Sequence, residues 1–100
     1  MADELQLART VSEAVLATEG VSSLGVGRYA EAATYGAGEK VTGVVVSLDE
    51  VRVHIVAHYP LSEPIPALAE RLRDRVASEV EGRTTTVVVE DLEVAQDVGL

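Results

Sequence analysis

The spacing of hydrophobic residues predicts a helix first, over Asp3 to Thr18. Its apolar side chains share one face, at positions 7, 11, 14 and 15. Asp3 can cap this helix, with Gln6 three residues later in a capping-box spacing. Gly20 follows as a residue that can adopt the left-handed conformation in which helices end. Residues 21–26 then predict a short first strand.

Alternating valines predict a β-hairpin in the middle of the chain. Residues 41–48 and 51–59 indicate two strands, with Asp49 and Glu50 as the short acidic joint between them. In the second strand one face is apolar and predicted to be core, and the other face is mixed, because successive side chains point to opposite sides. The core face comprises Val51, Val53, Ile55, Ala57 and Tyr59, and the mixed face Arg52, His54, Val56 and His58.

A second amphipathic helix is predicted over residues 65–80, with apolar side chains at positions 65, 68, 69, 72, 76 and 80. Positions 68, 72 and 76 are expected in the core. The β-branched residues 84–89 predict a last strand. Its three consecutive valines indicate burial on both faces, as at the centre of a sheet. The predicted fold is α+β in the order α-β-β-β-α-β, with both helices on one face of a mostly antiparallel sheet.

The segment 27–40 shows neither period, and it is rich in glycine and alanine. It predicts a flexible loop with a partial strand around residues 28–33. Loops of this length in a small domain are often functional. One candidate function is therefore a small-molecule or regulatory binding module that uses loop 25–40 and the mixed sheet face.

Composition sets the domain count. One hundred residues, 47% of them hydrophobic, predict a single domain over residues 1–100. Phenylalanine, tryptophan and cysteine are absent, so the core is expected to be aliphatic. Without cysteine there is neither a disulfide framework nor a thiolate metal site, which fits a reducing compartment.

Net charge and hydropathy narrow the range of partners. The net charge is −9, from seventeen acidic and eight basic residues. Such a surface disfavours nucleic acid, whose phosphates reward clustered lysine and arginine, and also disfavours docking on an anionic bilayer. No segment approaches the roughly 20 apolar residues of a membrane span, and the acidic start of the chain does not fit a signal peptide. We expect a soluble, cytoplasmic protein without direct membrane insertion.

The candidate chemistry is sparse. His54 and His58 are four residues apart, which on a strand means about 13 Å, too far to share one zinc ion. Serine-triad, nucleophile-elbow and HExxH patterns are absent from the sequence. An enzyme would need these histidines to converge with Glu50 and Tyr59 in a pocket. We predict no catalytic residue, no metal and no cofactor.

A cluster of arginines follows on the second helix, at positions 71, 73 and 75. Helical spacing predicts ion pairs between Arg75 and Glu79 and between Glu70 and Arg73. These arginines either form a solvent-exposed face of the helix or bind an acidic partner. The candidate interaction surface predicted from the sequence is Arg52, His54, His58, Arg71, Arg73 and Arg75.

Several weak motifs occur in a recognisable order. They are Glu19-Gly20-Val21, Gly43-Val44-Val45-Val46, the strand 51–56 with Tyr59, Pro64-Ile65-Pro66-Ala67-Leu68-Ala69, and the closing strand 87–94. Over residues 5–95 this order resembles the alkaline-shock protein family, the cell-envelope-stress proteins of Gram-positive bacteria. The chain departs from the family at Tyr59-Pro60, where members commonly carry Tyr-Gly, and at Gly82-Arg83-Thr84. A single lysine against seven arginines suggests a GC-rich genome, such as an actinobacterial one.

The resemblance implies a non-enzymatic protein that acts by association at the inner face of the cell membrane. Its implied partners are itself and/or a membrane-anchored envelope protein. The family has no known catalytic residues, so the resemblance assigns none to this chain.

Overall fold

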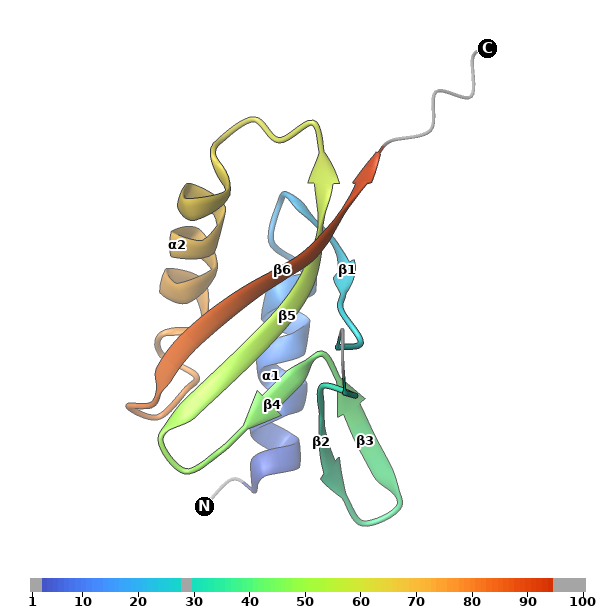
Figure 1. Cartoon of the computed structure of the whole chain (residues 1–100). Helices are drawn as coiled ribbons and strands as arrows, with labels where there is room; N and C mark the ends of the chain where they lie inside the picture. The colour runs from blue at the N-terminus through green and yellow to red at the C-terminus, as the bar shows by residue number, and fades with distance from the viewer. Residues whose placement is uncertain (1–2, 28–29, 95–100) are drawn as a thin grey trace.

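The computed structural model describes residues 3–27 and 30–94. Two helices pack against a mostly antiparallel sheet in the order α-β-β-β-β-β-α-β, as Figure 1 shows. The α+β class is confirmed, with two more strands before α2 than the sequence predicted. The elements are α1 (Glu4–Leu16), β1 (Val21–Leu24), β2 (Ala33–Gly36), β3 (Glu39–Thr42), β4 (Val44–Val46), β5 (Glu50–Tyr59), α2 (Ile65–Val76) and β6 (Thr84–Val94). Among the described residues, no helix is long and apolar enough to span a bilayer.

Strand β5 is the centre of the sheet. Along one edge it pairs in parallel with β6. Along the other edge it pairs antiparallel with β1 through its last residues and with β4 through its first. The central position predicted for β6 is therefore wrong. Among the described residues β6 has β5 as its one neighbour in the sheet, and Val87, Val88 and Val89 are half-buried rather than buried on both faces.

The core lies between the helices and one face of β5. The predicted register is confirmed, because the six residues expected in the core are at most 1% exposed: Val51, Val53, Ile55, Leu68, Leu72 and Val76. From α1, Leu7, Val11 and Val15 complete the cluster. Tyr59, assigned to the same face, is half-exposed at the end of β5.

Helix α1 begins as predicted. Asp3 is its N-cap, and the Asp3 carboxylate accepts a hydrogen bond from the Gln6 N–H at 2.7 Å. Gly20 has a φ of 101°, which favours glycine as expected. Helix α2 ends at Val76, earlier than the predicted residue 80, although Val80 is still buried.

Residues 27–40 are not the flexible loop that the sequence predicted. They contain β2 and the first half of β3, and these two strands form an antiparallel hairpin turning at Ala37 and Gly38. The partial strand predicted around residues 28–33 is represented by Ala33 alone, and positions 28–29 lie outside the described residues. Gly43 splits the predicted strand 41–48 into β3 and β4. It has a φ of 92°, and a Cβ there would lie 2.7 Å from Leu24 Cβ.

One threonine side chain of the β2–β3 hairpin forms hydrogen bonds with the outer edge of β4. The buried Thr34 hydroxyl donates to the Val44 carbonyl at 2.7 Å and accepts from the Val46 N–H at 3.0 Å. These two bonds replace the backbone ladder that another strand would supply. The outer edge of β4 is therefore occupied.

Candidate functional site

The face of the sheet opposite the helices is the mixed face predicted from the sequence. On β5 it carries Arg52, His54 and Val56, interleaved with the buried residues of the core face. In the neighbouring strands Val45 stands opposite Arg52, and Val88 stands opposite His54. Figure 1 shows both helices on the other side of the sheet. We call this surface the open face.

A β-bulge in β6 turns a carboxylate onto the open face. Ile55 pairs with Val89 and Val56 pairs with Asp91, so Glu90 is the extra residue between them. Bulges re-aim side chains in this way and occur preferentially near functional sites. The bulge places Glu90 within reach of both β5 and the segment after β1.

The Glu90 carboxylate is held by two donors in a nearly closed space. Its Oε2 lies 2.7 Å from His54 Nδ1 and accepts a hydrogen bond from the Gly27 N–H at 2.8 Å. The side chains of Glu90 and His54 are only 10% and 14% exposed. Gly25 makes room for them, since a Cβ there would lie 2.5 Å from the Glu90 carboxyl carbon. Glu90, His54, Gly25 and Gly27 together form what we call the Glu90 cluster.

A carboxylate that orients an imidazole is also part of hydrolytic triads, which need a nucleophile next to the imidazole. On this face the Ser22 hydroxyl instead donates to Glu93 at 2.5 Å. Within residues 3–27 and 30–94, no three acidic, histidine or cysteine side chains gather to hold a metal. The contacts of the Glu90 cluster thus fix the shape of the open face and link β6 through β5 to the segment after β1.

A hollow of about 400 Å³ adjoins this cluster on the open face. Apolar and backbone atoms form most of its wall, with carboxylates at one side. Its lining residues are Ser23, Leu24, Gly25, Val26, Val56, Glu90 and Asp91.

The six residues of the predicted interaction surface do not form one surface. Arg52 and His54 lie on the open face, where Arg52 pairs with Glu50 at 3.1 Å. His58 and Arg71 border a separate cavity of about 180 Å³. Arg73 and Arg75 are exposed on α2, which covers the opposite face of the sheet.

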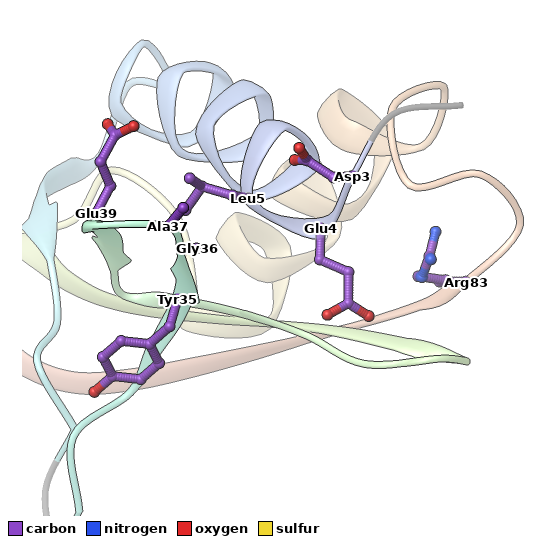
Figure 2. Close-up of a pocket in the computed structure, with 8 residues that line it drawn as sticks. All are labelled: Asp3, Glu4, Leu5, Tyr35, Gly36, Ala37, Glu39 and Arg83. Atoms are coloured by element: carbon purple, nitrogen blue, oxygen red, sulfur yellow. The ribbon is translucent and has the colours of Figure 1, made fainter.

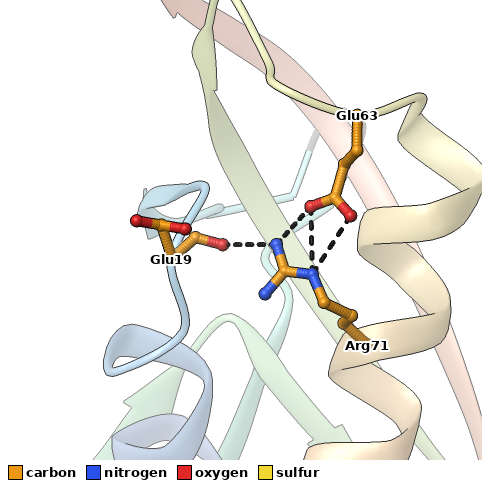
Figure 3. A network of polar contacts seen from close by, with 3 residues as sticks. All are labelled: Glu19, Glu63 and Arg71. Atoms are coloured by element: carbon orange, nitrogen blue, oxygen red, sulfur yellow. Dashed lines mark hydrogen bonds and ion pairs between the residues drawn. The ribbon is translucent and has the colours of Figure 1, made fainter.

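Arg71 connects three segments of the chain, as Figure 3 shows. Its Nε donates to both carboxylate oxygens of Glu63, at 3.0 and 3.1 Å, and its Nη2 donates to Glu63 and to the Glu19 carbonyl. The hydrogen bond from Arg71 lowers the pKa of the Glu63 carboxyl and raises the pKa of Arg71 itself. Arg71 therefore links α2 to the turn after α1, and its charge is paired with Glu63.

The ion pairs predicted along α2 do not occur among the described residues. Neither Arg75 with Glu79 nor Glu70 with Arg73 forms one, while Arg71 pairs with Glu63, which lies just before α2. This contact was missed because sequence spacing reveals partners within a helix and not partners before it.

A wider cleft of about 720 Å³ separates the start of α1 from the tip of the β2–β3 hairpin (Figure 2). Three of its four charged side chains have partners. Asp3 caps α1, Glu39 pairs with Arg9 at 2.7 Å, and the Arg83 Nε donates to the Ser47 carbonyl at 2.8 Å. The cleft is acidic, and the contacts of Asp3, Glu39 and Arg83 stabilise the fold.

Gly25 and Gly27 of the Glu90 cluster lie in loop 25–40, which the sequence indicated as a candidate binding segment, whereas Glu90 was not predicted. The available signal was a carboxylate ending a run of valines, together with a Gly-x-Gly after the first strand. Neither feature predicts its partner, because the two segments are 63 residues apart.

Comparison with protein-family models, with curated proteins and with solved structures finds no match for this chain. The family resemblance stated from the sequence therefore stays a prediction.

Proposed function

We propose that this domain is a non-enzymatic, envelope-stress-related protein that acts by association at the inner face of the cell membrane. Its partners in this proposal are a second copy of itself and/or a membrane-anchored envelope protein. One observation carries the proposal: the open face is partly apolar, is covered by no helix or strand among the described residues, and has polar side chains that contact one another within the domain. The sequence resemblance supplies the cellular setting.

The open face has the anatomy of a protein-binding surface. Val45, Val56 and Val88 are half-buried and alternate with polar side chains. Their polar neighbours are held in place by contacts within the domain, such as the pair of His54 with Glu90. Protein interfaces combine an apolar centre with a polar rim, and a preorganised surface loses less entropy on binding.

A small-molecule or regulatory binding module is the second candidate. The hollow beside the Glu90 cluster favours it, because that hollow joins the segment after β1 to the mixed sheet face. Its volume, about 400 Å³, is within the range of ligand pockets. A ligand bound there would raise the melting midpoint of the purified domain.

Co-sedimentation with native membranes tests the first candidate. Val56→Lys places a charge in the middle of the open face, and Leu48→Lys makes the same change at a turn residue that is 90% exposed. We expect the wild type and Leu48→Lys to be retained on membranes that carry their envelope proteins, and Val56→Lys to be released. Equal retention of both variants would exclude the open face as the binding surface.

Two further results would contradict the proposal. Equal retention on protein-free vesicles would indicate lipid binding instead of a protein partner. A turnover abolished by His54→Ala, with the fold intact by circular dichroism, would make the domain an enzyme.

A further inference from the structure

The outer edge of β6 is long and, among the described residues, unpaired. The strand runs over eleven residues, Thr84–Val94, and pairs on one side only, with β5. The Thr84 N–H donates to the Asp49 carbonyl at 3.0 Å, so the backbone N–H and C=O groups of Thr84 point toward β5. Backbone direction alternates along a strand. Thr85, Val87 and Val89 therefore direct their N–H and C=O groups outward.

The opposite edge of the sheet, formed by β1 and β4, is protected against pairing with another strand, whereas the β6 edge is not. Thr34 occupies the edge of β4 with two hydrogen bonds. Strand β1 has four residues and an irregular register at Ser22. Short and bulged edges resist pairing with another chain. The free edge of β6 is thus the one at which a further strand would be added.

The first half of this edge lacks the usual protection. Residues 84–89, Thr-Thr-Thr-Val-Val-Val, are β-branched and uncharged, with no lysine or proline. Natural proteins protect exposed edges with lysine, with proline or with a bulge. In β6 the bulge comes only at Glu90, followed by Asp91 and Glu93.

Helix α2 leaves space beside the edge. A hollow of about 400 Å³ lies between α2 and the start of β6, and Arg73, Asp74, Arg83 and Thr85 are among its lining residues. Its charges are of both signs, so a second copy of the same hollow meets no uniform repulsion there. An incoming strand therefore has room on the helix side.

We propose that a second copy of this chain pairs antiparallel with the β6 edge about a two-fold axis through Val87. Outward-directed residues must face one another, which sets Val87 opposite itself and Thr85 opposite Val89. The uncharged half of each strand then pairs with its equivalent. This inference rests on the proposed function and names one of its partners.

Charge selects the antiparallel arrangement. In this register Asp91 and Glu93 of each copy lie beyond Thr84 of the other copy, and not beside their own equivalents. A parallel pairing would set Glu90, Asp91 and Glu93 beside their own equivalents and would be repelled. A two-fold pairing also uses both free edges at once, so the assembly closes as a dimer.

Sedimentation of the purified chain across concentrations tests the pairing. The wild-type mass is expected to rise from 10.6 kDa toward twice that value as concentration increases. Thr85→Pro removes an outward N–H without changing the ladder with β5, and it should stay at the monomer mass. Thr85→Val keeps the N–H and should behave as the wild type. Equal association of Thr85→Pro and wild type, or a wild type that stays monomeric, would overturn the inference.

Cysteine cross-linking tests the register and does not require the proline variant to fold. The chain has no cysteine, so a single introduced one can cross-link only between copies. Val87→Cys lies on the axis and should form a dimer on mild oxidation. Thr85→Cys is about 13 Å from its equivalent and should not, since four residues of strand separate the two sites. Cross-linking by Thr85→Cys alone, or by neither variant, would overturn the inference.

Failure of this inference is distinct from failure of the proposed function. A chain that stays monomeric but loses membrane retention through Val56→Lys would leave the proposed function standing and remove the β6 dimer. A β6 dimer that native membranes do not retain would leave the dimer standing and remove the proposed function.

Discussion

Glu90 occupies a position in a valine-rich strand where an unpartnered carboxylate would be costly. Only 10% of its side chain is exposed, and burying a charge without partners is strongly unfavourable. His54 and the Gly27 N–H supply the hydrogen bonds that offset that penalty. The arrangement works because Gly25 has no Cβ. One carboxylate thus determines the residue type at a position 65 residues earlier in the chain.

Gly25→Ala should destabilise the domain through Glu90. The new Cβ would lie 2.5 Å from the carboxyl group, which must then move and lose one or both hydrogen bonds, at about 1–3 kcal/mol of unfolding free energy. In a Glu90→Ala background the same change should cost less than about 0.5 kcal/mol, because the obstacle is gone. Urea unfolding of the four proteins measures the difference. Equal costs in both backgrounds would disprove the coupling.

The Glu63–Arg71 contact should make stability depend on pH. The hydrogen bond from Arg71 lowers the pKa of folded Glu63 below its ordinary 4.5. The contact therefore stabilises the fold above that value, and its contribution is lost as the pH falls through the lower, folded pKa. Glu63→Gln should melt below the wild type at neutral pH, and the difference should vanish in acid. In an Arg71→Ala background the pH dependence of that difference should disappear. A difference that persists unchanged in acid would contradict the assignment.

At the scale of elements, the two faces of α2 should differ sharply in their contribution to stability. Leu72 is 1% exposed in the aliphatic core, and the neighbouring Arg73 is exposed. Leu72→Ala should reduce the unfolding free energy by about 2–5 kcal/mol through the cavity that it leaves. Arg73→Ala should change it by less than about 0.5 kcal/mol. Similar denaturation midpoints for the two variants would mean that α2 packs through another face.

The β2–β3 hairpin depends on Thr34 for its attachment to the sheet. Thr34→Val keeps the side-chain shape but leaves the Val44 carbonyl and the Val46 N–H without their partner. Unpaired buried polar groups cost about 1–3 kcal/mol each, so we expect a loss of that order in unfolding free energy. Amide hydrogen exchange should then speed up at Val46 while Ile55 stays protected. Unchanged exchange at Val46 would show that another group satisfies it.

Elements with a clear period could be predicted from the sequence, whereas contacts that depend on distant segments could not. Helix α1 and the register of β5 followed from apolar spacing. The hairpin at residues 33–42 was missed because its strands are short and fixed by Thr34, a tertiary contact. The run of valines in β6 suggested a central strand, yet such a run also occurs in an edge strand, where Val87 and Val89 pack against the core and Val88 lies on the open face. Of the candidate site, the open face and His54 were predicted, and Glu90 was not.

At the scale of the whole molecule, the net charge and the β6 edge have opposite effects on dimerisation. The net charge of −9 repels a second copy, while the uncharged residues 84–89 can pair with themselves. The Debye length falls from about 30 Å at 0.01 M salt to about 8 Å at 0.15 M, which weakens repulsion between exposed charges far more than it weakens strand pairing. Salt should therefore favour the dimer.

The last prediction follows from that balance. At a fixed protein concentration, the dimer fraction should increase as salt is raised through that range, and the gain should be absent in Thr85→Pro. Sedimentation equilibrium at several salt concentrations measures both, with Thr85→Val as the matched control. Any charge pairs between the copies would lose strength under the same screening. A dimer that dissociates as salt rises would therefore show that ion pairs, and not the uncharged edge of β6, hold the two copies together.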